Sequence, residues 1–216
     1  VGISGGIDSS VVSTLCANTG RRTIVLTMPI KQIKSQHDLS LLHAQWLKQK
    51  YKNVDHHLLE MDKIFNSFSQ VLNKFDNEHG YANSRARLRM ASLYQVAAAN
   101  NGIVVGTGNK VEDFGVGFYT KYGDGGVDIS PIADCTKSQV WELGKYLGVS
   151  ENIINTPPTD GLWDDGRNDV QQLGMSYEDL EKAMEDKNDP NYKKYLEIRE
   201  KNLHKMNPIP VCKFNE

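Results

Sequence analysis

Short apolar segments alternate with longer amphipathic segments through the first half of this chain. The apolar segments at residues 1–3, 23–28, 54–59 and 103–106 predict short buried strands. Helices are predicted between and after them, at residues 9–18, 38–50, 61–75 and 83–101. Strands that alternate with helices in this way form a parallel sheet covered on both faces. The pattern therefore predicts a doubly wound α/β fold.

The second half of the chain is predicted to hold a long glycine-rich loop and three further helices. The loop covers residues 110–126, and its length favours a functional role over a simple turn. The helices are predicted at residues 136–147, 177–186 and 190–204. Two prolines precede an acidic stretch that contains Asp160, Asp164, Asp165 and Asp169. A chain of 216 residues, 39% of them hydrophobic, has the size and composition of a single domain, residues 1–216.

The balance of charged residues and the number of cysteines exclude several kinds of partner and site. Its 25 basic and 27 acidic residues give a net charge of −2, so neither nucleic acid nor an anionic membrane is an expected partner. Cys16, Cys135 and Cys212 are widely spaced, which suggests neither disulfides nor a zinc site and fits a reducing cytoplasm. The first predicted strand has only three residues before the loop that follows it, so we expect that an upstream segment is missing.

The most informative segment is residues 4–10, Ser-Gly-Gly-Ile-Asp-Ser-Ser, which joins the first predicted strand to the first helix. Its glycines let the backbone approach an anion, and the helix points unpaired N–H groups at it. Asp8 would repel a phosphate unless a divalent cation such as Mg²⁺ lies between them; the alternative is that Asp8 only caps the helix. The segment matches neither a Walker A motif nor a dinucleotide fingerprint, so it predicts a nucleotide-phosphate site of another class.

Three other positions are candidates for the same site. Thr107 follows the fourth predicted strand, at the sheet edge where ligands of such folds bind. Glu112 lies five residues further on and could share a metal with Asp8; the alternative is a surface glutamate after a glycine turn. Lys137 lies in the first turn of a helix, where the dipole disfavours a cation, so it suggests an anionic ligand unless it is simply exposed.

Arginines occupy alternate positions on the fourth predicted helix, at Arg85, Arg87 and Arg89. This spacing spreads them around the helix, so they cannot all share one role. Guanidinium groups suit phosphate and carboxylate ligands, although exposed arginines on helices are common.

In combination, these segments resemble known families. Ser-Gly-Gly-x-Asp-Ser resembles the loop of the ATP pyrophosphatases, and the segments taken in order along nearly the whole chain resemble ammonia-dependent NAD synthetase. This resemblance implies a doubly wound α/β homodimer with ATP as cosubstrate and Mg²⁺ as cofactor. It implies a ligase that adenylates the nicotinate carboxylate of deamido-NAD, after which ammonia displaces AMP to give NAD.

The resemblance also assigns roles to individual residues. Asp8 and Glu112 would bind Mg²⁺ and, with Lys137, form the catalytic group. The residues expected to bind ATP are Gly2, Ile3, Ser4, Gly5, Gly6, Ile7, Asp8, Ser9, Thr107, Lys137 and Thr159. Those expected to bind deamido-NAD are Arg87, Lys121, Asp128, His204 and Lys205.

Two features depart from this family. Val170 stands near a position where the family often has glutamate, and the amino-terminal helix of the family is missing here. Two other functions remain open at this point. One is an ATP pyrophosphatase that amidates or thiolates a nucleobase, and the other is a non-catalytic ATP-binding regulatory module.

Overall fold

The computed structural model describes residues 1–163 and 165–214. Asp164 and the last two residues of the predicted domain lie outside this description. The helical elements, in chain order, are α1 (Ile7–Asn18), α2 (Lys34–Lys50), α3 (Asp62–Val71), η1 (Asn73–Phe75), α4 (Glu78–Ala99), η2 (Lys110–Val116), α5 (Lys137–Leu147), α6 (Glu151–Ile154), α7 (Asp169–Leu173), α8 (Tyr177–Glu185) and α9 (Tyr192–Met206). Of these, η1 is a 3₁₀ helix and η2 is a π-helix.

Two parallel strands, β1 (Thr23–Thr27) and β2 (Val54–Leu58), form the sheet. The first and fourth predicted strands are wrong in extent, because each appears as a single parallel bridge. Gly2 pairs with Leu26, and Val105 pairs with Ile129. Each segment runs directly into a glycine turn, which leaves too few residues for a ladder. The direction of pairing is parallel throughout, and the predicted single-domain α/β class is confirmed.

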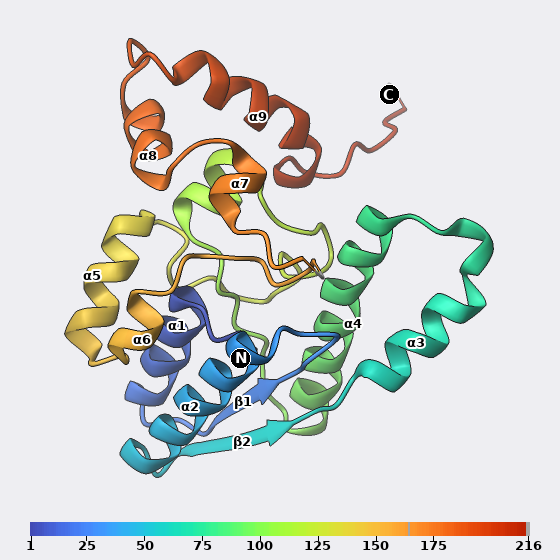
Figure 1. Cartoon of the computed structure of the whole chain (residues 1–216), viewed down its shortest axis with the longest axis vertical. Helices are drawn as coiled ribbons and strands as arrows, with labels where there is room; N and C mark the ends of the chain where they lie inside the picture. Colours follow the sequence, from blue (N-terminus) through green and yellow to red (C-terminus); the bar gives the residue numbers. More distant parts are fainter. Residues whose placement is uncertain (164, 215–216) are drawn as a thin grey trace.

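Helices cover both faces of β1, as the doubly wound prediction requires (Figure 1). Val25 is buried in one cluster with Ala44 and Leu47 of α2. The next residue, Leu26, points the other way into a cluster that includes Leu93 of α4. Successive side chains of a strand face opposite sides, so both faces of β1 are core. Burying each such side chain contributes roughly 1.5–3 kcal/mol.

Several helix boundaries differ from the predicted ones for local reasons. The helix α4 begins five residues earlier than predicted, because the Asn77 side chain accepts a 2.7 Å hydrogen bond from the Gly80 N–H and caps it. The predicted helix at residues 61–75 is interrupted after Val71 and continues as η1. In contrast, α5 begins after a Thr136 capping box and ends at the left-handed Gly148, close to the prediction.

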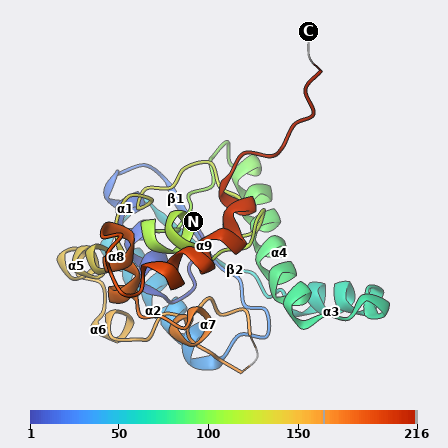
Figure 2. The same ribbon diagram turned by 90° about the horizontal axis from the view of Figure 1, so that it is seen from above.

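The second half of the chain contains elements that the apolar pattern did not predict. The helix η2 lies at the start of the predicted glycine-rich loop, and α7 lies at the end of the acidic stretch. Figure 1 shows α7, α8 and α9 grouped at one end of the molecule, next to the green segment that carries η2. Figure 2 shows the residues after α9 running away from the body, where residues 207–214 are exposed. In the part of the chain that the structure describes, no helix combines the length and apolarity needed to span a bilayer.

A buried histidine joins α2 to the helix that follows the glycine turn. His43 is 2% exposed, its Nε2 lies 3.0 Å from Ser13 Oγ, and its ring stacks on Trp46 with centroids 5.4 Å apart. Burial lowers the pKa of His43 to about 4, although a hydrogen bond with the Ser10 backbone opposes this shift. The imidazole is therefore neutral in the folded protein at neutral pH.

We expect His43 to make the folded protein sensitive to acid. The unfolded chain takes up a proton at this site near its ordinary pKa of about 6.5, whereas the folded chain does so near 4. The stabilisation is thus complete above about pH 6.5 and is lost as the pH falls toward 4, by about 3 kcal/mol. Chemical denaturation at pH 7 and pH 4.5 measures this loss. The variant His43→Gln should lose less stability over that interval, and an equal loss in both proteins would contradict the expectation.

Candidate active site

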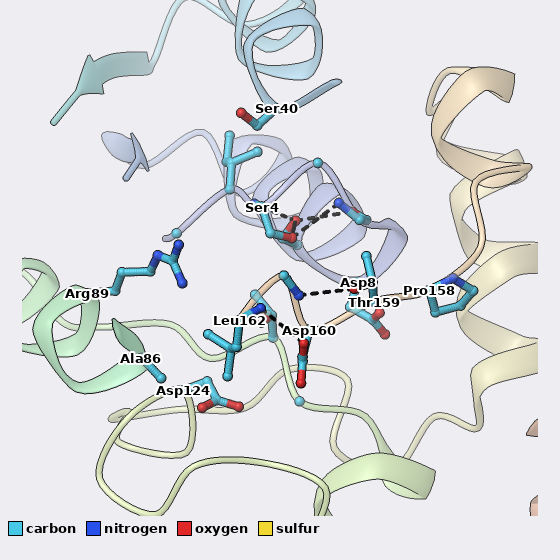
Figure 3. Close-up of a pocket in the computed structure, with 18 of the residues that line it drawn as sticks. Ser4, Asp8, Ser40, Ala86, Arg89, Asp124, Pro158, Thr159, Asp160 and Leu162 are labelled. Carbon is cyan, nitrogen blue, oxygen red and sulfur yellow. Dashed lines mark hydrogen bonds between the residues drawn. The ribbon is translucent and has the colours of Figure 1, made fainter. Parts of the chain in front are cut away.

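One pocket of about 250 Å³ collects every residue predicted to contact ATP. Residues 2–9 form one wall, and Thr107, Glu112, Lys137 and Thr159 line it from other segments. Figure 3 shows Ser4, Asp8 and Thr159 around this pocket. The glycine turn and the segment after the fourth predicted strand were predicted to share one site, and Asp8 and Glu112 do face the same pocket. The roles of these residues remain predictions.

The glycine turn has the conformation that a close anion site needs. Gly5 has φ 91°, and a Cβ there would lie 2.5 Å from the Gln36 carbonyl oxygen. The Ser4 and Ser9 hydroxyls lie 3.1 Å apart, and Ser4 Oγ accepts a 3.2 Å bond from the Gly6 N–H. The interpretation of Asp8 as the helix cap is wrong, since the N-cap of α1 is Gly6 and Asp8 lies in the first turn. Its carboxylate is thus available for other partners.

Lys137 holds the two predicted metal ligands together. Its Nζ donates to Asp8 Oδ2 at 2.5 Å and to Glu112 Oε1 at 2.8 Å, and the residue is 1% exposed. The interpretation of Lys137 as an exposed lysine is therefore wrong. The sequence predicted an anionic partner at this position, and two carboxylates of the chain itself fill that role here.

Burial and charge act against each other in this cluster. Burial lowers the pKa of Lys137, but the charges of Asp8 and Glu112 raise it more, so the ammonium form is favoured. Burial raises the pKa of Asp8, Lys137 acts to lower it, and the charge of Glu112 raises it, so that it stays above its ordinary value. Burial also acts to raise the pKa of Glu112, but Lys137 and a hydrogen bond from Tyr177 hold it below its ordinary value. Glu112 is therefore the more strongly ionised of the two acids.

Asn109 connects the two carboxylates through the backbone of the π-helix. Its Oδ1 accepts 3.0 Å bonds from the N–H groups of Val111 and Glu112, which caps η2. Its Nδ2 donates to Asp8 Oδ1 at 2.9 Å. The residue is fully buried, so one amide fixes the start of the helix and the orientation of Asp8 together. This role was not predicted from the sequence, although an asparagine directly before a helix is a recognisable cap.

Two further residues of the site, Tyr177 and Asp169, were given no role in the site on the basis of the sequence. The Tyr177 hydroxyl lies 2.5 Å from Glu112 Oε1 and 2.7 Å from Asp169 Oδ2. A phenol carries one proton and can donate it to only one of these acids. Burial, and then the charge of Glu112, raises the pKa of Asp169 to about 7, so Asp169 is the acid that can donate to the Tyr177 oxygen. Asp169 Oδ1 is buried without a hydrogen-bond partner at the pocket wall.

The donor set of the site fits Mg²⁺. This ion prefers oxygen ligands, and proteins usually hold it by one or two carboxylates together with substrate phosphates. Asp8 and Glu112 supply two carboxylates that meet at a single ammonium nitrogen, beside a loop suited to phosphate. Among residues 1–163 and 165–214, no cluster of three or more potential ligands stands ready to bind a metal. A phosphate-bearing substrate would therefore be needed to complete such a site.

The five residues predicted for deamido-NAD lie outside this pocket. Three of them are linked by successive hydrogen bonds. Arg87 Nε donates to the Lys121 carbonyl at 3.3 Å, and Lys121 Nζ donates to the His204 carbonyl at 2.7 Å. Lys205 is the next residue along α9. Asp128 instead accepts bonds from the Tyr94 hydroxyl (3.1 Å) and the Val104 N–H (2.7 Å). The structure thus joins α4, the glycine-rich loop and α9 at the predicted second substrate site, whose role stays a prediction.

The arginine that reaches the ATP pocket is a different one, Arg89. It is held at the wall by Met28 O, 2.9 Å from its Nε, and by Gln32 Oε1, 3.0 Å from its Nη2. Figure 3 shows its side chain extending from α4 toward the pocket. Burial lowers the pKa of Arg89 to about 10, which leaves it charged at neutral pH. Alternating arginines on a helix were predicted to differ in role, but the sequence did not show which one faces inward.

Comparison with known proteins gives one consistent result. Residues 1–212 match the family model described as NAD synthase. The chain is 39% identical to NH(3)-dependent NAD(+) synthetase of Alkaliphilus metalliredigens, over 91% of this chain and 81% of the relative. It is 34% identical to the protein of the same name from Archaeoglobus fulgidus, over 100% and 88%.

Solved structures agree with these sequence matches. The structure of NMN synthetase from Francisella tularensis superposes with a TM-score of 0.90 at 32% identity, covering 99% of this chain and 88% of that one. NH3-dependent NAD synthetase from Campylobacter jejuni gives 0.76 at 27%, covering 98% and 87%. The match to the family model spans nearly the whole chain, and both sequence relatives exceed 30% identity. The chain belongs to the NAD synthase family.

Proposed function

We propose that the chain converts deamido-NAD to NAD with ATP and ammonia. The nicotinate carboxylate attacks the α-phosphorus of ATP, pyrophosphate leaves, and ammonia then attacks the mixed anhydride and releases AMP. The observation that carries this proposal is the meeting of Asp8, Glu112 and Lys137 in one pocket with the glycine turn. Membership of the NAD synthase family supports the same reaction.

The residues of the pocket act by position and charge. N–H groups of the turn and of the first turn of α1 bind phosphate oxygens, and Lys137 balances charge that grows on the departing pyrophosphate. Asp8 and Glu112 would hold Mg²⁺, which supplies Lewis-acid stabilisation of the phosphates when bound. Holding the carboxylate beside ATP makes the displacement effectively intramolecular. No residue needs to act as a general base in the adenylation step.

A stoichiometric assay separates this function from the two alternatives. With ATP, Mg²⁺, deamido-NAD and ammonium, the purified protein should form NAD and AMP in equal amounts. An enzyme that modifies a nucleobase would form AMP only when its nucleobase substrate is supplied, whether or not deamido-NAD is present, and a regulatory module would form none in either mixture. Release of ADP in place of AMP would also contradict the proposed mechanism.

A second candidate is formation of NMN from the corresponding mononucleotide acid by the same chemistry. The observation that favours it is the closer superposition on NMN synthetase, with a TM-score of 0.90 against 0.76 for NAD synthetase. Measuring kcat/KM for both acid substrates at saturating ATP decides between them. A preference of about tenfold or more corresponds to at least about 1.4 kcal/mol of differential binding in the transition state.

A pair of neighbouring arginines provides a matched test of the two substrate sites. Arg87→Ala should raise KM for deamido-NAD about tenfold or more and leave KM for ATP nearly unchanged, because Arg87 lies outside the ATP pocket beside Lys121. Arg89→Ala should mainly raise KM for ATP, since Arg89 lines that pocket. Steady-state kinetics with each substrate varied in turn measures both effects. Equal losses for both substrates in Arg87→Ala would contradict its proposed role.

We also propose that the protein forms a homodimer, and that it is located in the reducing cytoplasm. Large apolar side chains are exposed on α3 and η1, where Ile64 is 54%, Val71 81% and Phe75 78% exposed. Burying such side chains against a second copy would remove them from water. All three cysteines are free thiols, which suits a reducing compartment. Sedimentation equilibrium tests the dimer, and a mass of one chain at micromolar concentration would reject it.

A further inference from the structure

The last helix of the chain, α9, holds the end of the π-helix that carries Glu112. A helix leaves its final carbonyl groups without partners inside the helix, so they need donors from elsewhere. Three side chains of α9 supply these donors: Arg199 Nη1 to the carbonyls of Phe114 and Gly115 (2.5 Å to the latter), Asn202 Nδ2 to that of Val116 (3.0 Å) and Lys205 Nζ to that of Gly117 (2.9 Å).

The three donors belong to one face of α9. Arg199, Asn202 and Lys205 are spaced three residues apart, which places them along one side of a helix. The two helices also approach closely, because a Cβ at Gly117 would lie 2.6 Å from Asn202 Cβ. Gly117 has φ 67°, so the close contact and the left-handed turn both require glycine at this position. The face of α9 is thus fitted to the backbone of η2 rather than lying loosely over it.

This contact lies close to the metal ligand. Glu112 is two residues before Phe114, and its own carbonyl accepts a 2.8 Å bond from the Phe118 N–H in the same turn. Its backbone N–H is fixed at the other end by Asn109. Glu112 is therefore held from both sides, by an asparagine cap before it and by the α9 donors after it. Removing the α9 donors would free the carbonyl end of η2 to shift or to unwind.

We propose that Arg199 and Asn202 are positioning residues for Glu112. They fix the carbonyl end of η2 and so set the place at which the Glu112 carboxylate meets Asp8 and Lys137. This inference rests on the proposed function, in which Glu112 binds the metal. Partners that orient a metal ligand typically change metal affinity by about 10–100-fold when they are removed.

Metal binding by the full chain tests this role independently of catalysis. Electron paramagnetic resonance measures the Kd for Mn²⁺ in the presence of a non-hydrolysable ATP analogue. Asn202→Asp keeps the size of the side chain but replaces the amide donor by an acceptor, and it should raise this Kd by at least about tenfold. Arg199→Lys keeps the charge but loses the guanidinium fork, and it should raise the Kd severalfold. Both should raise the Mg²⁺ concentration that gives half-maximal NAD formation.

Two controls make the result decisive. Lys201→Gln changes an exposed side chain on the same helix and should leave the Kd and the activity as in the parent protein. Parental Mn²⁺ affinity in both Asn202→Asp and Arg199→Lys would overturn the inference, and Arg199→Lys alone decides it if Asn202→Asp does not fold. Glu112→Gln separates this outcome from failure of the proposed function. If Glu112→Gln also binds Mn²⁺ like the parent, Glu112 is not a metal ligand and the positioning role is rejected with it, whereas the proposed reaction stands or falls by the formation of NAD and AMP in the parent protein.

Discussion

Lys137→Met is expected to lower kcat about a thousandfold and to destabilise the protein by about 3–5 kcal/mol. Lys137 is the cation that both Asp8 and Glu112 contact, and it is almost fully buried. Methionine preserves much of the volume but leaves two acids facing each other without a positive charge. The rate falls because no fixed cation balances charge on pyrophosphate, and stability falls because a buried charge loses its partner.

Rapid-quench measurement of AMP formation reports the first effect, and denaturant unfolding reports the second. Lys145→Met is the matched control, because Lys145 is exposed on the same helix, α5. This control should keep the parental rate and stability. Lys137→Met with a parental rate of AMP formation would show that the lysine serves the fold and not the chemistry.

Asp8→Asn is expected to lower kcat by about 10²–10³-fold while the protein stays folded. The substitution keeps the size of the side chain and removes the charge that a metal requires. Stability should change little, because burial already raises the pKa of Asp8 and the neighbouring charge of Glu112 raises it further. Removing one of two adjacent negative charges offsets the weakened contact with Lys137.

Steady-state NAD formation at saturating Mg²⁺ measures this loss, with the thermal unfolding midpoint as the test of folding. Asp38→Asn, on the exposed surface of α2, provides the control for an equal change of charge. Unchanged turnover in Asp8→Asn would remove the argument that the acid of the glycine turn binds a metal.

The sequence predicted the parts of the fold that depend on local signals. The helix α5 has its capping threonine before it and its glycine after it, so both ends were found. The π-helix η2 also has a capping residue before it, Asn109, and a left-handed glycine after it, Gly117, but it lies in a glycine-rich stretch that was predicted to be a loop. It depends on Asn109 at its start and on side chains of α9, more than 80 residues later, at its end. Apolar periodicity contains no information about such distant partners.

In the candidate site, too, the parts that depend on a local motif were predicted, and the parts that depend on distant residues were not. The glycine turn is a continuous motif, and its position before a helix was enough to predict a phosphate site. Lys137 was predicted to face an anion, but not that the anions are Asp8, 129 residues away, and Glu112, 25 residues away. Tyr177 and Asp169 join the site only because α7 and α8 pack beside η2. Val170, where the family often has glutamate, is 41% exposed on α7.

In the proposed mechanism, Asp8 holds a divalent metal in the active enzyme. Replacing it by a thiol changes which metal the site prefers, because thiolate ligands favour Cd²⁺ over Mg²⁺. Asp8→Cys should be nearly inactive with Mg²⁺ and should recover NAD formation when Cd²⁺ is added. Asp8→Ala retains the three native cysteines and should recover nothing. Equal activity of the two variants with Cd²⁺ would contradict the claim that Asp8 is a metal ligand.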